Sequence, residues 1–160
     1  MMRVTLSQCV QIARMRRRDS RRVVAACELF DGRLDFDATR RYLSDRRNLF
    51  LLASDGPTPV GFLRGTLLRQ MRTVRPQFFL YEVGVVPSAR RRGVGKALVE
   101  RMLSFARRAG CEEAFVLTST TNRAAVALYR STGGHTETPG DRMYVYLLSR
   151  RSRAPRRVRP

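Results

Sequence analysis

The chain has 160 residues, and with 43% hydrophobic and 28% charged residues it has the composition of a globular protein of about one domain. No uninterrupted apolar run approaches the ~20 residues that a membrane-crossing helix needs, so we expect no membrane partner. The net charge of +19 invites anionic partners. However, 32 residues are basic and only Lys96 among them is not arginine, a bias that a GC-rich coding background explains equally well.

Apolar periodicity and turn residues predict an alternation of strands and helices along the chain. The expected elements are, in chain order, a strand at residues 10–15, a helical segment at 22–30, a helix at 38–45, strands at 49–54, 60–68 and 77–86, a helix at 94–109, a strand at 114–117, a helix that ends before residues 133–134, and a strand at 143–148.

Single residues indicate how several of these elements begin and end. Asp37 is expected to cap the helix at 38–45, because its carboxylate can accept hydrogen bonds from free N–H groups. The turn Asp55-Gly56-Pro57 is expected to join two strands into a hairpin. Gly84 within a strand indicates a bulge or a close approach to the backbone, and Pro87 ends that strand.

The order of these elements predicts an α+β (mixed α/β) fold, in which helices lie on the faces of a central sheet. We expect a single domain at residues 10–148, with an N-terminal extension at 1–9 and a basic tail at 149–160. The sequence leaves open whether the chain forms a homodimer.

Metal sites and disulfides are not expected from the cysteine and histidine content. Cys9, Cys27 and Cys111 form no CxxC pair, and His135 is the single histidine. The N-terminal residues show no apolar signal core with a small-residue cleavage site, so we expect a cytoplasmic location.

The most informative segment is a glycine-rich basic turn between a strand and a helix, with the pattern R-x-x-G-x-G from Arg90 to Gly95. The free N–H groups and the positive end of the helix dipole favour a phosphate in such a turn. The Walker pattern is excluded, because Arg90 and Ala97 stand where it needs a glycine and a hydroxyl. The dinucleotide pattern GxGxxG fails at Leu98.

A second motif follows the next strand, where Asn122 to Gly133 read N-x-x-A-x-x-L-Y-x-x-x-G. Together, the two motifs resemble those of the GNAT superfamily of acetyltransferases. The resemblance implies a mostly antiparallel central sheet and acetyl-coenzyme A as cosubstrate, its diphosphate held by main-chain N–H groups of the turn and its pantetheine arm by Asn122. The residues expected to contact it are Val83, Val85, Arg90, Arg91, Arg92, Gly93, Val94, Gly95, Lys96, Asn122 and Ala125.

Transfer of an acetyl group to an amine needs a base, a site for the developing oxyanion and an acid for the thiolate. Glu82 is the candidate base, although a strand carboxylate paired with an arginine is nearly as good an interpretation. Backbone N–H groups freed by a bulge near Gly84 and Val85 could hold the oxyanion. The resemblance places Tyr129 opposite the thioester sulfur as the acid, and a tyrosine of the core is the alternative.

Within the superfamily, three segments resemble class I aminoglycoside 3-N-acetyltransferases, which inactivate antibiotics: residues 26–32, 80–83 and 116–118. The acceptor implied is a small-molecule amine. Asp31, Asp35 and Asp141 could attract its ammonium groups, and capping of helices together with pairing to arginines is the alternative for these carboxylates.

Other functions stay open at this stage. A protein with a charge of +19 should repel a polycationic antibiotic at long range. Protein N-termini or another small amine are therefore alternative acceptors. From a different class, the chain could be an arginine-rich nucleic-acid-binding module, but it shows no RNA-recognition strand and no helix-turn-helix, so nucleic acid is not favoured as a partner. An acetyl-coenzyme A sensor without turnover is a third possibility.

Overall fold

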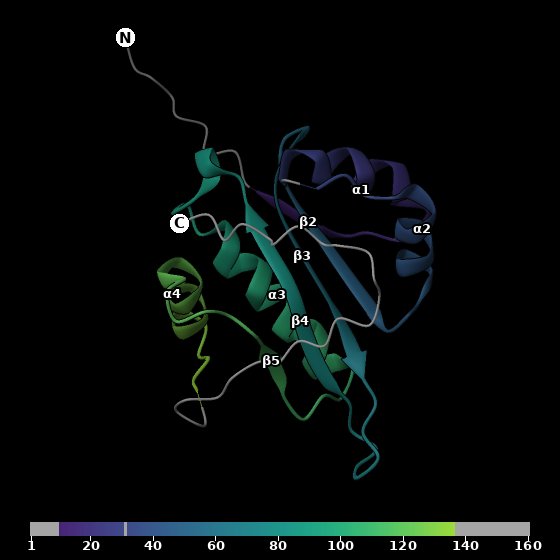
Figure 1. Cartoon of the computed structure of the whole chain (residues 1–160), viewed down its shortest axis with the longest axis vertical. Helices are drawn as coiled ribbons and strands as arrows, with labels where there is room; N and C mark the ends of the chain where they lie inside the picture. The colour runs from purple at the N-terminus through teal and green to yellow at the C-terminus, as the bar shows by residue number, and fades with distance from the viewer. Residues whose placement is uncertain (1–9, 31, 137–160) are drawn as a thin grey trace, which may run out of the picture. The chain divides into compact units, whose positions relative to one another are not determined.

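The computed structural model describes residues 10–30 and 32–136 of the chain. They belong to two compact units, Met1–Leu117 and Thr118–Pro160. The first unit is built on a five-stranded sheet (Figure 1). Its elements are β1 (Gln11–Arg14), α1 (Ser20–Cys27), α2 (Phe36–Ser44), β2 (Asn48–Asp55), β3 (Thr58–Leu68), β4 (Gln77–Val85), α3 (Val94–Arg108) and β5 (Ala114–Val116), with short 3-10 helices η1 (Arg17–Asp19), η2 (Glu28–Phe30) and η3 (Pro87–Ala89). The second unit contains α4 (Arg123–Ser131).

The sheet is mixed and mostly antiparallel, which confirms the fold class expected from the sequence. Its strands lie in the order β1-β2-β3-β4-β5. The first four pair antiparallel with their neighbours, and β5 pairs parallel with β4. The hairpin predicted around Gly56 is present, because Asp55 pairs with Thr58 across the turn. The strand expected at residues 143–148 lies outside the described residues.

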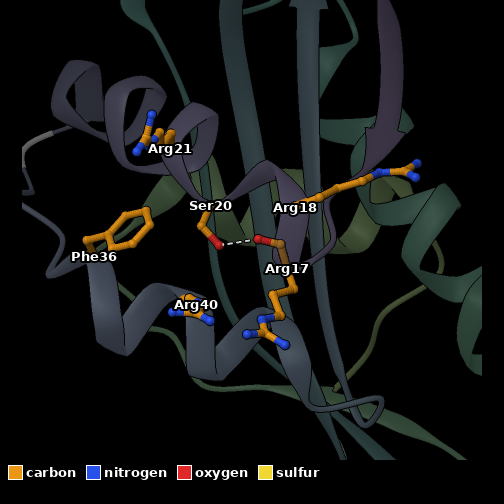
Figure 2. Close-up of a pocket in the computed structure, with 6 residues that line it drawn as sticks. All are labelled: Arg17, Arg18, Ser20, Arg21, Phe36 and Arg40. Carbon is orange, nitrogen blue, oxygen red and sulfur yellow. Dashed lines mark hydrogen bonds between the residues drawn. The ribbon is translucent and has the colours of Figure 1, made fainter.

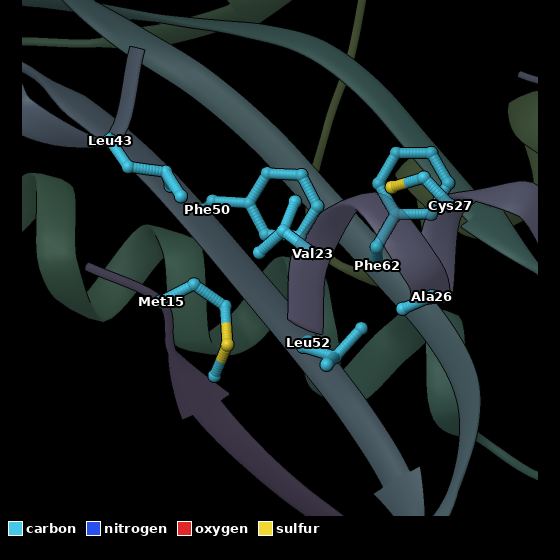
Figure 3. Packing of buried hydrophobic residues seen from close by; sticks show 8 residues of the cluster. All are labelled: Met15, Val23, Ala26, Cys27, Leu43, Phe50, Leu52 and Phe62. Carbon is cyan, nitrogen blue, oxygen red and sulfur yellow. The ribbon is translucent and has the colours of Figure 1, made fainter. Parts of the chain in front are cut away.

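One face of the sheet packs against α1 and α2 (Figures 1 and 3). The apolar cluster on this face includes Val23 and Cys27 of α1, Phe50 and Leu52 of β2, and Phe62 of β3. The Phe50 and Phe62 rings stack with centroids 5.7 Å apart. Since β2 is buried along both faces, its run of apolar residues makes it a central strand.

The opposite face packs against α3. Phe78 of β4 meets Phe105 of α3 edge to face, with ring centroids 5.8 Å apart. A Cβ atom at Gly61 would lie 3.1 Å from Val94 and 3.2 Å from Leu98, so the helix comes very close to β3 here. This contact fixes the N-terminal end of α3 on the sheet.

The helix cap predicted at Asp37 is wrong by two residues. The Asp35 carboxylate accepts a hydrogen bond of 2.7 Å from the Ala38 N–H, and α2 begins at Phe36. Asp37 therefore lies inside the first turn of the helix. None of the helices in residues 10–30 and 32–136 has the length and apolar character needed to cross a membrane.

Candidate active site

A bulge in β4 determines where Glu82 points. Arg64 of β3 pairs with Glu82, but the next residue of β3, Gly65, pairs with Leu80, so Tyr81 is an extra residue in β4. In regular alternation, Glu82 would share a face with Phe78 and Leu80, which are buried on the α3 side. The extra residue instead turns Glu82 to the α1 and α2 face, with Arg64.

The bulge expected near Gly84 is therefore misplaced. Gly84 pairs in regular register with Phe62. A Cβ atom at Gly84 would lie 2.7 Å from the Phe62 ring. The glycine is explained by this close approach, which was the other interpretation of its presence in a strand.

Glu82 forms an ion pair with Arg64. The alternative interpretation from the sequence, a strand carboxylate paired with an arginine, therefore describes part of its environment. Both side chains are about one-third exposed, and the distance between Nη2 and Oε2 is 2.8 Å. The Arg64 guanidinium also lies 4.3 Å from the centre of the Tyr81 ring. Arg64 and Tyr81 were not among the predicted site residues; Arg64 is distant in sequence and reaches Glu82 only through the pairing of β3 with β4.

A cysteine close to this pair stays in its thiol form. Burial raises the pKa of Cys27 to about 11, with a smaller contribution in the same direction from Glu82 and an opposing one from Arg64. Since the thiolate is the nucleophilic form of cysteine, Cys27 is not set up as a nucleophile.

The edge of β4 beyond its pairing with β5 offers main-chain hydrogen-bonding groups. The parallel pairing ends at Leu80. The Val86 N–H donates to the Val60 carbonyl at 3.0 Å. By the alternation of an antiparallel ladder, the main-chain groups of Val83 and Val85 point away from β3, toward the open edge. Arg90 confirms this direction, since its Nε donates to the Val85 carbonyl at 3.1 Å.

The turn after β4 presents the N-terminus of α3. The first hydrogen bond that closes back along the helix runs from the Ala97 N–H to the Gly93 carbonyl at 2.9 Å. The N–H groups of Val94, Gly95 and Lys96 precede it and have no acceptor within the helix. No side chain caps this helix, whereas Asp35 caps α2 and Asn122 caps α4.

Two residues of the turn have left-handed backbone conformations. Gly93 at the N-cap has φ +82°. Arg91 has φ +60°, which is uncommon for a residue with a side chain and is often found at functional sites. Left-handed residues of this kind favour turns whose successive N–H groups can bind an anion, as the N-terminus of a helix also does.

The basic side chains of the turn have different surroundings. Arg90 is bonded to the strand end, and Arg92 forms an ion pair of 3.2 Å with Asp55 in the hairpin turn. Lys96 lies 3.9 Å from Glu100, one helical turn along α3. Arg91 is exposed and has no ion pair among the described residues. The main chain and Arg91 are therefore the groups of this turn most available to a phosphate.

The second unit contains the remaining predicted contact residues. The Asn122 side chain accepts a hydrogen bond of 3.1 Å from the Ala125 N–H and so caps α4. Tyr129 lies on the same helix, and burial raises the pKa of its phenol above the usual value of 10.0. The phenol is therefore protonated at neutral pH, as a proton donor must be.

The acidic residues predicted for the acceptor are only partly described. Asp31 and Asp141 lie outside the described residues. Asp35 caps α2 through one carboxylate oxygen, and its role toward an acceptor stays a prediction. Within residues 10–30 and 32–136, no three or more His, Cys, Asp or Glu side chains lie close enough together to hold a metal ion.

A mixed sheet with an open strand edge, followed by an uncapped helix that can bind an anion, is compatible with the cosubstrate site that the two motifs imply. The comparison with family models identifies the family: residues 11–133 match the model described as the acetyltransferase (GNAT) family. The chain belongs to this family, as its two motifs led us to expect.

Similar proteins are named as N-acetyltransferases. N-acetyltransferase family 8 member 3 of Mus musculus is 34% identical over 119 residues, which cover 74% of this chain and 51% of that protein. The chain thus spans about half of that relative. N-alpha-acetyltransferase RimI of Mycobacterium tuberculosis is 34% identical over 96 residues, 60% of this chain and 58% of that protein.

The fold has a solved counterpart in an aminoglycoside acetyltransferase, meta-AAC0020, from an uncultured soil metagenomic sample. The TM-score is 0.80, and the match covers 89% of this chain and 99% of that chain. The sequence identity is 23%, so this likeness supports the fold and does not extend to the acceptor.

Proposed function

We propose that the protein transfers the acetyl group of acetyl-coenzyme A to the amine of an aminoglycoside-like acceptor. The observation that carries the proposal is the position of three features in sequence and space: Glu82, the outward main-chain groups of Val83 and Val85, and the uncapped N-terminus of α3 follow one another within the first unit. A base, a strand edge and an anion site are the parts that this reaction uses.

Each part has a role in the proposed reaction. The diphosphate binds the N–H groups of the turn and of the first residues of α3. The extended arm of the cosubstrate pairs with the edge of β4 at Val83 and Val85. Glu82 accepts the proton of the acceptor's ammonium group, directly or through water, so that a neutral amine attacks the thioester carbonyl.

The reaction then has to dispose of a thiolate. The new C–N bond forms as the C–S bond breaks, and the sulfur takes a proton. Tyr129 is proposed as its source, since burial keeps the phenol protonated. Asn122 is proposed to contact the arm of the cosubstrate through the amide nitrogen that does not cap α4.

An aminoglycoside is the first choice of acceptor because three segments resemble class I aminoglycoside 3-N-acetyltransferases. Asp31, Asp35 and Asp141 are the carboxylates proposed to attract its ammonium groups. A protein N-terminus is the second candidate, and the likeness to RimI favours it. The net charge of +19 would repel a polycationic acceptor at long range, which also favours the second candidate.

One assay separates these acceptors. Release of free thiol from acetyl-coenzyme A is measured with gentamicin-like aminoglycosides, with polyamines and with peptides that carry free N-termini. The proposal expects the aminoglycosides to give the highest kcat/KM, and mass spectrometry with NMR of the product then locates the acetyl group on the 3-amine or elsewhere. A response to peptides alone would transfer the proposal to the second candidate. No thiol release with any amine would overturn both.

A further inference from the structure

A shallow groove in the first unit lies between the start of α1 and the start of α2, beside the α2 cap Asp35 and away from Glu82 in sequence. Its volume is about 660 Å³. Figure 2 shows the side chains around it. The residues that line it are Arg17, Arg18, Ser20, Arg21, Phe36 and Arg40. Four of the six are arginines, and none carries a carboxylate.

The arginines of this groove are available to a ligand. None of the four takes part in the ion pairs found among the described residues. Three carboxylates lie next to these residues in the chain: Asp19 accepts from the Arg16 N–H at 2.8 Å, Asp35 caps α2, and Asp37 lies in the first turn of α2 and forms none of the ion pairs found among the described residues. Arg18 extends away from the other three arginines in Figure 2. Arg17, Arg21 and Arg40 therefore provide the positive charge of the groove.

An aromatic ring completes the groove. Phe36 is the first residue of α2, and its side chain is 41% exposed, whereas most phenylalanines of the unit are buried or half-buried. Figure 2 shows the ring between α1 and α2, beside Arg21 and Arg40. A solvent-exposed ring among guanidinium groups offers a surface on which a base can stack while the arginines hold phosphates.

We propose that this groove binds a single-stranded nucleic acid, with phosphates on Arg17, Arg21 and Arg40 and a base on Phe36. Guanidinium forks suit phosphate oxygens, and arginine is preferred over lysine for this contact. A concave site lined by a ring fits a flexible strand better than a flat membrane surface, and an acidic peptide has no base to stack. No local pattern indicates this site, because the groove combines residues 17–21 with residues 36–40.

Fluorescence anisotropy with a labelled single-stranded oligonucleotide of about 12 nucleotides tests the proposal over a range of salt concentrations. The R21A/R40A variant removes two phosphate contacts, so the slope of log K against log salt is expected to flatten by about 1.4. The matched control is R101A/R107A, which removes two exposed arginines from α3 and is expected to leave the slope within error. Equal flattening in both variants would show that net charge alone governs binding and would overturn the proposal.

The base contact is tested at Phe36. F36L is expected to weaken binding roughly 5- to 100-fold, and F36Y is expected to restore it, because a tyrosine ring also stacks. An oligonucleotide without bases at its centre should lose the same factor on the unchanged protein. Melting temperature and acetyl-coenzyme A binding serve as fold controls.

Competition identifies the class of ligand. Unlabelled oligonucleotide is expected to displace the probe, and polyglutamate or vesicles containing phosphatidylserine are expected to displace it only at far higher charge concentration. Equal displacement by either competitor, or F36L binding unchanged, would overturn the assignment to nucleic acid.

Discussion

Arg64 and Glu82 face each other across β3 and β4, and both contacts between them end on one carboxylate oxygen. Arg64 Nη2 and Nε lie 2.8 Å and 2.9 Å from Glu82 Oε2. The second oxygen, Oε1, takes no part in this pair. An ion pair of this form orients the carboxylate and leaves one oxygen to accept a proton, so pairing with an arginine and service as a base are compatible roles for Glu82.

Glu82→Gln tests the role of this oxygen. The amide keeps the shape of the side chain but does not accept the proton of the amine, so kcat should fall about 10²- to 10⁴-fold. Acetyl-coenzyme A binding should be nearly unchanged, and stability should fall by about 0–1 kcal/mol because the pair is partly exposed. Steady-state kinetics, calorimetry and urea unfolding measure the three quantities. Unchanged kcat would remove Glu82 from the mechanism.

Tyr129→Phe tests the proposed acid. The substitution removes the phenol proton and keeps the ring, so kcat should fall by up to roughly 10²- to 10⁴-fold with little change in cosubstrate affinity. Tyr42→Phe is the matched control, since Tyr42 of α2 hydrogen-bonds to the Gly65 carbonyl of β3 and has no proposed part in the reaction. Equal effects of the two substitutions on kcat would contradict a specific role for Tyr129.

Tyr42 should make stability depend on alkaline pH. Its hydroxyl donates to the Gly65 carbonyl at 2.8 Å, and burial raises its pKa from 10.0 to about 12. The unfolded chain loses this proton near pH 10 while the folded protein keeps it. The stabilisation is therefore complete below pH 10 and is lost as the pH rises toward 12.

Urea unfolding of the protein and of Tyr42→Phe from pH 8 to pH 11.5 measures this effect. The variant should be less stable by about 1 kcal/mol at pH 8, because a hydrogen bond is lost. Its free energy of unfolding should then fall less steeply above pH 10 than that of the unchanged protein. Cys27 contributes the same dependence to both proteins, so parallel curves would contradict the assignment to Tyr42.

Gly65→Ala should disturb the bulge. A Cβ atom at Gly65 would lie 2.5 Å from Phe78 Cε1 and closer still to the Phe79 carbonyl oxygen, and neither backbone nor packed ring can easily move. We expect a loss of about 1–3 kcal/mol or more. Gly32→Ala is the control, since nothing lies within 4 Å of its Cβ position. Thermal melting measures the stability of both variants. A loss confined to Gly65→Ala would show that the clash causes it, and an equal loss in Gly32→Ala would show that removal of any glycine suffices.

Gly93→Ala tests whether the turn binds the diphosphate through its main chain. Gly93 has φ +82° and Gly56 has φ +59°, and neither Cβ position has a neighbour within 4 Å. Both alanine variants should therefore lose about 1–3 kcal/mol of stability through backbone strain. Only Gly93→Ala should weaken acetyl-coenzyme A binding, by roughly tenfold or more, as measured by calorimetry. If Gly93→Ala and Gly56→Ala bound acetyl-coenzyme A with equal affinity, the diphosphate would have to bind elsewhere.

Local sequence signals predicted most of the strands and helices. The Asp55-Gly56-Pro57 turn and the apolar run of β2 predicted the hairpin. The periodic apolar residues of α3 predicted that helix within one residue at each end. These elements were predictable because their signals lie within a few residues of one another. The cap of α2 was misplaced because Asp35 and Asp37 carry the same capping side chain two residues apart.

The surroundings of the site could not be predicted in the same way. The glycines and arginines of the turn indicated an anion site, but the position of the bulge depends on how β3 pairs with β4. Gly84 was the residue from which the sequence predicted a bulge, but this glycine is explained by the close approach of the Phe62 ring. The partnership of Glu82 with Arg64 joins residues 18 positions apart, which no local pattern encodes.

As the extra residue of the bulge, Tyr81 affects which face of the sheet the side chains after it in β4 occupy. A deletion of Tyr81 would restore regular alternation from Leu80 to Glu82 and leave Glu82 opposite Arg64, whereas loss of the bulge with Tyr81 retained would turn Glu82 into the apolar layer beneath α3. Alignments of this family should therefore count the acidic position forward from the irregular pair, not from the start of the strand. A homologue whose β4 lacks the extra residue would carry its acid directly after the residue that corresponds to Leu80.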